Sequence, residues 1–159
     1  MNCMRYGKTH LDKIIIFLAT GGYCGFFPFF PGTIGTFVAV ILYYLLYPVN
    51  LNFQITFLCA FILLAIPISH RAEKIFQEKD APYIVIDEFA GFFVSMFLLL
   101  PTYTNLLLAF LFFRFFDIIK LPPISFAEKR FTGGLGVVMD DVLAGIYTNF
   151  IIQVINHIY

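Results

Sequence analysis

The sequence contains few charged residues, no tryptophan and only three cysteines. Charged residues make up 13% of its 159 residues, against about 25% in typical soluble domains. Ten acidic and ten basic residues give no net charge, which argues against nucleic-acid binding through bulk positive charge. Cys3, Cys24 and Cys59 lack CxxC or Cys/His ligand spacing. We therefore expect free thiols rather than a disulfide framework or a zinc site.

Charge is missing altogether from long stretches of the chain. No Asp, Glu, Lys or Arg occurs in residues 14–70 or 89–113, or after Asp141. Hydrophobic residues make up 60% of the sequence, and the mean hydropathy is +0.88. A lipid bilayer explains this pattern, because uncharged stretches cross it and charged stretches lie where water begins.

The apolar stretches predict an all-α fold, a compact helical bundle embedded in a membrane, with residues 1–159 forming a single domain. Residues 14–36 are apolar but interrupted by glycines and prolines, which favours an interfacial or re-entrant segment over a straight spanning helix. Two apolar helical hairpins and a C-terminal helix follow. The hairpins pair 37–48 with 53–69 and 83–100 with 106–120, and the last helix covers 137–159.

Two hairpins place all the charged groups on one side of the membrane. Lys and Arg in short loops favour the cytoplasmic side, so we expect that face to lie in the cytoplasm. The predicted spans are short, at about 15 to 18 residues against the roughly 20 that cross a bilayer. A soluble or peripheral helical bundle with a very apolar core is the structural alternative.

Acidic residues recur where charged sequence meets apolar sequence. They are Asp87 with Glu88, Asp117, and Asp140 with Asp141. Carboxylates gathered from several helix ends suit a hard cation such as Mg²⁺, and no His or Cys accompanies them as a zinc or copper site would require. Each acid taken alone is equally well explained as a helix-end or interfacial charge.

The segment FFRFFDIIK places Arg114, Asp117 and Lys120 at positions i, i+3 and i+6. On a continuous helix these side chains fall on one face, within roughly 120°. They can form a cation pair for phosphate with a carboxylate for metal. The alternative is an intrahelical salt bridge beside a lysine that reaches toward the aqueous boundary.

Two glycine-rich segments, PGTIGT and FTGGLG, offer donors for an anion. Thr33, Thr36, Gly133 and Gly134 can present hydroxyl and N–H groups to phosphate oxygens. A helix cap with a tight turn is the alternative, and from the residues alone the more frequent one. No cysteine-phosphatase loop and no DxDx phosphoaspartate motif is present, which leaves metal-assisted attack on phosphorus by water or by a carboxylate.

Four segments together resemble bacterial phosphatidylglycerophosphatase A. They are PGTIGT, IVIDEFAG, FRFFDIIK with a following PI, and GGLGVVMDDVLAG, in the order and spacing of that family, across roughly residues 21–145. The resemblance implies a Mg²⁺-dependent membrane phosphatase with an all-helical fold. It implies that phosphatidylglycerophosphate is converted to phosphatidylglycerol, a precursor of cardiolipin.

The resemblance also assigns roles to individual residues, and it adds Asp80 as an acid that often precedes the IVxDE segment. We expect the five carboxylates to act in catalysis and to hold one or two Mg²⁺ ions. These are Asp87, Glu88, Asp117, Asp140 and Asp141. We expect the substrate phosphate to be bound by Thr33, Thr36, Arg114, Lys120, Gly133 and Gly134.

The sequence therefore predicts a lipid phosphatase in the bacterial cytoplasmic (inner) membrane, with its active site facing the cytoplasm and its substrate held in the lipid bilayer. Three alternatives remain open. The chain can be a small membrane transporter, because charges within short spans can line a pathway. It can be a non-catalytic membrane subunit, or a phosphatase for another lipid phosphomonoester.

Overall fold

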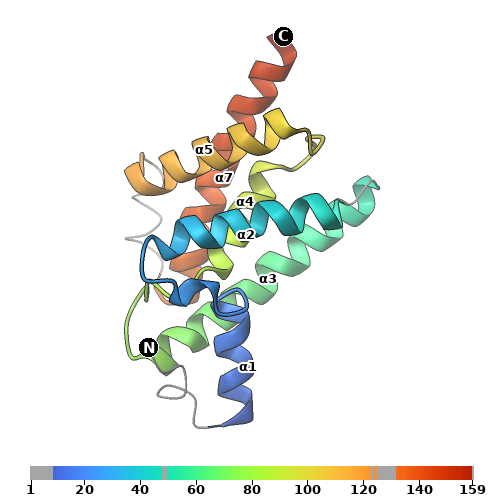
Figure 1. Ribbon diagram of the computed structural model, residues 1–159. Helices are drawn as coiled ribbons and strands as arrows, with labels where there is room; N and C mark the ends of the chain where they lie inside the picture. The colour runs from blue at the N-terminus through green and yellow to red at the C-terminus, as the bar shows by residue number, and fades with distance from the viewer. Residues whose placement is uncertain (1–8, 48–49, 123, 125–131, 159) are drawn as a thin grey trace.

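The computed structural model describes residues 9–47, 50–122, 124 and 132–158, and this part of the chain contains six α-helices, one short 3-10 helix and no strand (Figure 1). The all-α prediction is confirmed. In chain order the elements are α1 (His10–Ala19), η2 (Cys24–Phe26), α2 (Pro31–Leu46), α3 (Leu51–Phe76), α4 (Ile86–Ser95), α5 (Tyr103–Ile119) and α7 (Gly134–Ile158).

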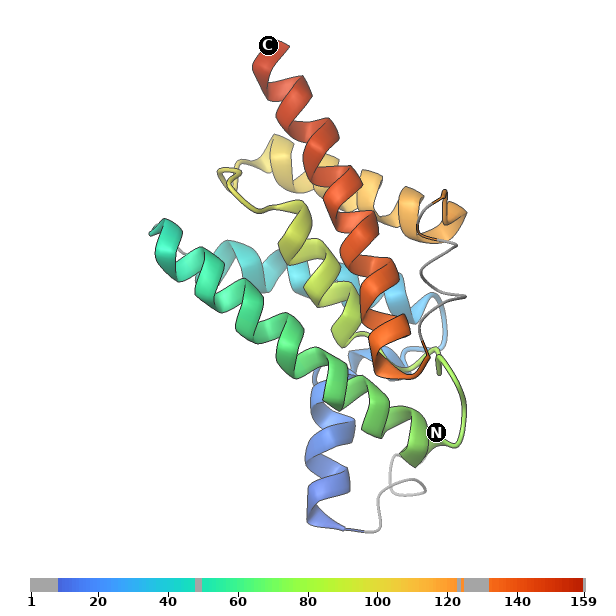
Figure 2. The ribbon, with the colours of Figure 1, turned by 180° about the vertical axis from the view of Figure 1, so that it is seen from behind.

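Helix α4 lies at the centre of the molecule, and α2, α3, α5 and α7 all pack against it (Figure 2). Nine of its ten residues are buried, and Phe92 is completely buried. A helix enclosed on all sides has to be apolar all round, and the sequence from Phe89 to Ser95 meets this requirement. The short α4 is therefore a core helix of the described bundle, with its N-terminal turn as its one strongly polar part.

The predicted hairpins appear as consecutive helices that spread around α4. Helices α2 and α3 diverge from the turn that joins them, and both pack on α4 (Figure 1). Helix α5 follows α4 and also contacts α2 and α7. The bundle is thus organised around one buried helix rather than as two hairpins lying side by side.

Several predicted helix boundaries are wrong, among them the start of α5, which lies at Tyr103 instead of residue 106. Helix α2 begins at Pro31 instead of residue 37, because proline is well suited to the first position of a helix, where no N–H partner is needed. Helix α4 is confined to Ile86–Ser95 within the predicted 83–100. Leu98 beyond it has a positive φ of 62°, which helical residues do not adopt. Helix α7 begins at Gly134, three residues before the predicted start.

The N-terminal segment is bent, as its glycines and prolines predict. Helix α1 opens with a capping box in which Thr9 and Asp12 exchange hydrogen bonds of 3.1 Å between side chain and backbone. Gly21 and Gly22 then adopt positive φ angles of 55° and 69°, which glycine tolerates best. The chain turns there into η2 and reaches α2, so no straight helix runs through residues 14–36.

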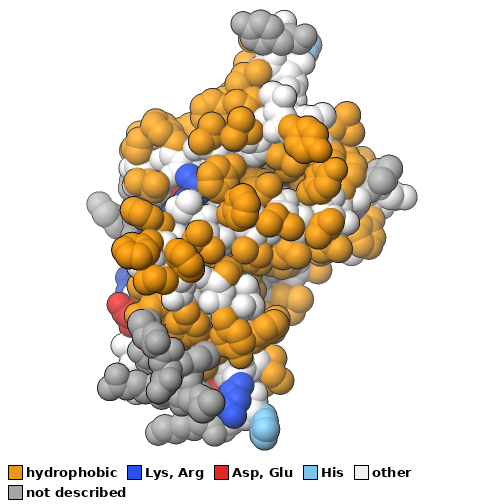
Figure 3. Space-filling model, viewed as in Figure 1, with side chains coloured by type: hydrophobic (Ala, Val, Ile, Leu, Met, Phe, Trp, Pro, Cys, Tyr) orange, Lys and Arg blue, Asp and Glu red, His pale blue; other side chains and the backbone are white. Residues whose placement is uncertain are grey.

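Much of the surface is hydrophobic (Figure 3). Helices α3 and α7 are long and apolar enough to cross a membrane, by length and composition. Only 11% of the most apolar 18-residue window of α3 is buried inside the protein, against 56% for α7. Cys24 and Cys59 are free thiols as predicted, whereas Cys3 lies outside the described residues. The exposed apolar face of α3 suggests that the protein associates with a membrane.

Helices α4 and α7 approach each other closely at two glycines. A methyl group at Gly145 of α7 would collide with the carbonyl oxygen of Gly91 and would lie 3.0 Å from Cβ of Val94. A methyl group at Gly91 would lie 2.6 Å from the carbonyl oxygen of Asp141. These obstacles belong largely to the backbone, which cannot move aside as a flexible side chain can. The glycine pair therefore fixes the distance between the helices that carry the acidic residues.

We expect Gly145→Ala to destabilise the protein by about 1–3 kcal/mol, because the added methyl group overpacks the contact between α4 and α7. Thermal unfolding of the purified protein in detergent, followed by circular dichroism, measures the change. Ile146→Ala is the matched control, since Ile146 is adjacent and exposed. Equal stability of Gly145→Ala and the wild type would contradict the close helix contact.

Candidate active site

Asp87 and Glu88 lie in the first turn of α4, where the chain enters the core. The backbone N–H of Val85, just before the helix, donates a 2.8 Å hydrogen bond to the carbonyl oxygen of Ala19 at the end of α1. Val85 itself is fully buried, so the start of α4 is held both by the hydrogen bond to α1 and by core packing. Unpaired N–H groups and the helix dipole favour negative charge at an N-terminus, which suits two carboxylates at this place.

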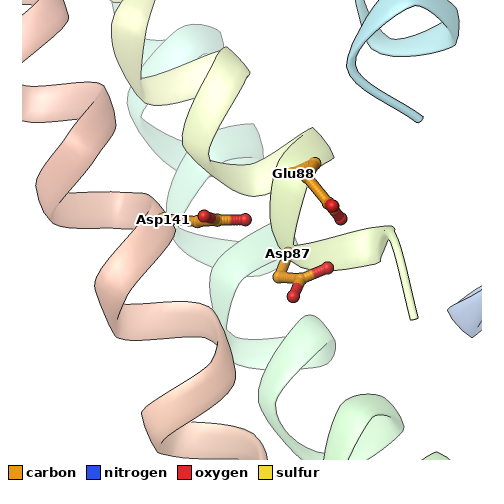
Figure 4. A group of neighbouring side chains, drawn as sticks. All are labelled: Asp87, Glu88 and Asp141. Carbon is orange, nitrogen blue, oxygen red and sulfur yellow. The ribbon is translucent and has the colours of Figure 1, made fainter. Parts of the chain in front are cut away.

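Asp141 extends from α7 toward that first turn of α4 (Figure 4). One carboxylate oxygen from each of Asp87, Glu88 and Asp141 can be chosen so that the three lie within 4.8 Å of one another. Asp87 and Asp141 are only 7% and 4% exposed. The structure therefore brings three of the five predicted carboxylates into one buried cluster, which we call the acidic triad.

The acidic triad lacks the polar partners that buried carboxylates need. Burial raises the pKa of the Asp87 carboxyl well above its ordinary value, and the charge of Glu88 raises it further. Burial is also the main reason that the pKa of Glu88 rises to about 7. Asp87 Oδ1 and Glu88 Oε2 are buried without a hydrogen-bond partner within the described part of the chain.

The unsatisfied oxygens of the acidic triad indicate whether a metal ion fits between the three carboxylates. Buried polar atoms are nearly always hydrogen-bonded in native proteins, and buried charges are paired or bind metals. Three oxygens this close together, without a nitrogen or sulfur ligand, match the preference of a hard divalent cation. The triad can therefore bind a metal ion.

Arg114 and Asp117 form an ion pair on α5 beside the acidic triad. Arg114 Nη1 lies 2.7 Å from Asp117 Oδ2 and 4.0 Å from Glu88 Oε1. The nearby start of α2 depends on Gly32, where a methyl group would collide with the Glu88 carboxylate and lie 3.1 Å from Arg114 Nη2. The predicted salt bridge within the helix is therefore present, and its arginine also faces the triad.

Lys120 pairs with Asp140, the neighbour of Asp141. Its Nζ donates a 2.9 Å hydrogen bond to Asp140 Oδ2. The prediction that Lys120 shares a helical face with Arg114 is wrong, because α5 ends at Ile119 and Lys120 has a left-handed φ of 48°. The two adjacent aspartates thus have different partners: Asp141 joins the acidic triad, and Asp140 binds a cation.

Asp80 is held close to the site by a residue to which the sequence assigned no role. The backbone N–H of Asp80 donates a 2.9 Å hydrogen bond to Glu73 Oε1, and Glu73 is a buried residue of α3. The charge of Asp80 contributes to raising the pKa of Asp87. The signal for Glu73 was its spacing from Ala65, Ser69 and Ala72, which places it on the buried face of α3.

The first predicted phosphate-binding turn, PGTIGT, forms the start of α2. Helix α2 has Phe30 at its N-cap without a side-chain cap, so the alternative that a threonine caps this helix is wrong. Thr36 is fully buried, and its hydroxyl donates a 2.9 Å hydrogen bond to the carbonyl oxygen of Gly32. Thr33 is half-buried in the first turn of α2.

Gly133 and Gly134 lie at the start of α7, against α3. A methyl group at either glycine would contact His70, at 2.5 Å from Nδ1 in the case of Gly133. Asp141 follows Gly134 by seven residues, which is about 10 Å along a helix. The structure therefore gives these glycines a packing role beside α3, and it does not place them next to the acidic triad.

The arrangement can neutralise and orient a phosphate group. The buried Asp87 and Asp141 and the half-buried Glu88 can hold a cation, and Arg114 and Lys120 supply positive charge from α5 and its end. Positive groups fixed around a phosphoryl group stabilise the charge that develops during its transfer. The geometry therefore supports phosphoryl chemistry better than a purely structural cluster.

Comparisons with known proteins agree with this chemistry. A model of the family described as "Phosphatidylglycerophosphatase A" matches residues 17–156. The chain is 35% identical to "Phosphatidylglycerophosphatase A" of Haemophilus influenzae (strain ATCC 51907 / DSM 11121 / KW20 / Rd), over 94% of this chain and 93% of the relative. It is 30% identical to the protein of the same name from Escherichia coli (strain K12), over 88% and 82%.

A third relative has a different name. The chain is 35% identical to the "Putative phosphatidylinositol-3-phosphatase" of Bacteroides thetaiotaomicron (strain ATCC 29148 / DSM 2079 / JCM 5827 / CCUG 10774 / NCTC 10582 / VPI-5482 / E50), over 87% of this chain and 91% of the relative. No solved structure matches the chain significantly. The family model and the two relatives that share its name cover most of the sequence. The chain belongs to the phosphatidylglycerophosphatase A family of lipid phosphatases.

Proposed function

We propose that this protein is a Mg²⁺-dependent phosphatase that hydrolyses phosphatidylglycerophosphate to phosphatidylglycerol and phosphate. The family supplies the reaction class, and two relatives carry the name of this activity. The observation that carries the proposal is the buried acidic triad of Asp87, Glu88 and Asp141. A transporter would distribute its carboxylates along a pathway, whereas a metal-dependent phosphatase gathers them around the metal ion that meets the phosphate.

In this proposal the acidic triad holds Mg²⁺. When bound, the ion supplies positive charge to the phosphoryl oxygens and activates a water for attack. Asp117 and Asp140 act through the basic residues with which they pair. Asp117 orients Arg114, and Asp140 orients Lys120. This division of roles refines the prediction that all five carboxylates are metal ligands.

Arg114 and Lys120 bind the phosphate of the substrate. The planar guanidinium of Arg114 suits two phosphate oxygens at once, and Asp117 fixes its orientation from one helical turn away. The half-buried Thr33 can add a hydroxyl donor from α2. Roles for Thr36, Gly133 and Gly134 in phosphate binding stay predictions, and their present contacts favour packing.

We place the protein in the bacterial cytoplasmic membrane as a single domain, with α3 and α7 as its spanning helices. Their length and composition support this placement. The acidic triad and its basic residues then lie at the cytoplasmic boundary, where a lipid phosphate meets water. The bend between α1 and α2 forms the interfacial segment at the same boundary.

The second candidate substrate is a phosphatidylinositol 3-phosphate. One relative at 35% identity has a name that specifies this lipid. Both lipids present a phosphate monoester on a polyol head group, so the triad, Arg114 and Lys120 suit either one. The choice between them depends on contacts with the rest of the head group.

We expect the purified protein in detergent to release inorganic phosphate from phosphatidylglycerophosphate in the presence of Mg²⁺. Chelation by EDTA should abolish the release, and added Mg²⁺ should restore it, because the metal supplies charge and the attacking water. Phosphatidylinositol 3-phosphate and phosphatidate, assayed in parallel, test head-group choice. A higher kcat/KM for phosphatidylinositol 3-phosphate would overturn the substrate and keep the reaction class.

We expect Asp141→Asn to lower kcat/KM by roughly 100-fold or more. The variant loses one of the three carboxylates that hold the metal ion, and the positive charge of that ion stabilises the transition state. Titration with Mn²⁺, followed by electron paramagnetic resonance, should show an affinity at least roughly tenfold weaker. Thermal stability should be kept or increased, because the variant removes a buried charge.

Glu78→Gln is the matched control for this variant. Glu78 is an exposed carboxylate outside the acidic triad, so its variant should retain wild-type activity and Mn²⁺ affinity. Full activity of a folded Asp141→Asn protein would refute a catalytic role for the triad.

A further inference from the structure

An apolar groove runs between α2 and α5 on the face shown in Figure 3. Its volume is about 460 Å³, within the range typical of ligand pockets. Nine residues line it, five from α2 and four from α5, and all are aliphatic or aromatic. Several of them are largely exposed, including Phe37 and Leu107. We call this feature the α2–α5 groove.

One end of the α2–α5 groove lies beside the candidate active site. Phe37 of the groove follows Thr33 by four residues, and Phe110 precedes Arg114 by four. Residues four apart on a helix lie one above the other, about 6 Å along the axis. Gly32 and Arg114 are in close proximity at this end. The groove therefore begins one helical turn from the arginine that faces the acidic triad.

Two tyrosines stack across the groove near its other end. The rings of Tyr44 and Tyr103 stack with centroids 6.5 Å apart and an interplanar angle of 23°. The two helices thus run antiparallel, in contact near Gly32 at one end and near Tyr44 at the other (Figure 1). Twelve residues separate these points on α2, which is roughly 18 Å of helix. The result is a long apolar channel with a charged end and an aromatic end.

We propose that the α2–α5 groove binds one acyl chain of the lipid whose phosphate enters the acidic site. This inference rests on the proposed function, and it names the part of the substrate that the groove holds. A lipid phosphate monoester has the same order of parts as the groove, with its charged group at one end and a long hydrocarbon chain leading away. Van der Waals contact with the aliphatic and aromatic side chains of the groove holds such a chain along its length, without any contact to its head group.

The continuity with the charged end distinguishes this groove from the other apolar surfaces. The outer face of α3 is also exposed and apolar, with Leu63 and Leu64 on it, yet neither residue lines the groove. Bulk lipid or a neighbouring protein helix can cover such a face without reference to the active site. An acyl chain in the α2–α5 groove instead carries its own phosphate toward Arg114.

The first experiment fills the groove. Ile41→Trp and Leu107→Trp are made separately, one on each wall, so that a folding defect in one variant leaves the other available. Each is assayed with a long-chain phosphatidylglycerophosphate and with its dibutanoyl analogue, whose acyl chains are too short to fill the groove. We expect KM for the long-chain lipid to rise about tenfold, with kcat and the kinetics on the short-chain analogue within about twofold of wild type.

Leu63→Trp on α3 is the matched control, since it adds the same side chain to an exposed apolar helix face outside the groove. It should leave both substrates unaffected. Unchanged KM in both groove variants, or equal losses on the long-chain and short-chain substrates, would overturn the proposal. Equal effects of Leu63→Trp would show that general contact with lipid, rather than this groove, sets KM.

The second experiment needs no turnover, so it separates the groove from the proposed function. Wild-type protein in detergent is photolabelled with a phosphatidate that carries a diazirine at the end of an acyl chain, and the labelled peptides are identified by mass spectrometry. We expect labelling in α2 and α5 that is competed by unlabelled lipid phosphate and is lost in Ile41→Trp. Absence of phosphate release with this labelling pattern would overturn the enzymatic proposal alone. Labelling that is not competed, or that falls equally on α3, would overturn the groove.

Discussion

Three carboxylates gathered between α4 and α7, of which Asp87 and Asp141 are buried, constrain the rest of this structure. Burying an ionised carboxylate is costly unless a cation or hydrogen bonds compensate it, and here two of the oxygens have no hydrogen-bond partner in the described part of the chain. The protein lowers this cost with the N-terminal end of α4, with Arg114 from α5, and with the capacity to hold a divalent cation. The first of these requires α4 to begin at the acidic triad, and the second requires α5 to pass beside it.

Close packing makes this arrangement possible. Gly91 and Gly145 let α4 and α7 approach until backbone meets backbone, which brings Asp141 next to Asp87. Gly32 likewise allows the first turn of α2 to approach Glu88 and Arg114 closely. These glycines do no chemistry themselves. They set distances between side chains that do, which explains why small residues occur at the borders of acidic motifs in so apolar a chain.

The sequence singled out candidate acids but not their geometry. Charge placement drew attention to five carboxylates, because a carboxylate next to a long apolar run is conspicuous, and the structure brings three of them together. Which acids meet could not be derived, since adjacency in sequence places Asp140 and Asp141 about 100° apart on a helix and does not say what each direction faces. Lys120 was predicted to lie on the same helix as Arg114, but α5 ends at Ile119. The periodicity of a helix does not show at which residue the helix ends. The shortness of α4 likewise depends on its tertiary surroundings, which override the local apolar pattern, whereas the start at Pro31 follows from a local preference of proline that the apolar pattern did not include.

The two halves of α7 differ in charge. Its N-terminal half carries the aspartates, whereas its C-terminal half carries neutral amides that bind the turn after α4. Asn149 Nδ2 donates hydrogen bonds of 3.0 and 2.7 Å to the carbonyl oxygens of Ser95 and Phe97, and Asn156 Nδ2 donates one of 3.2 Å to Asn105 Oδ1. Amides satisfy backbone carbonyls without adding charge, so this end is polar and uncharged while the other is polar and ionised. In the proposed placement of α7 across the membrane, its ionised half lies at one boundary and its uncharged half at the other, which accounts for both halves of the helix. The proposed phosphatase chemistry then lies at the boundary where α7 carries its charge.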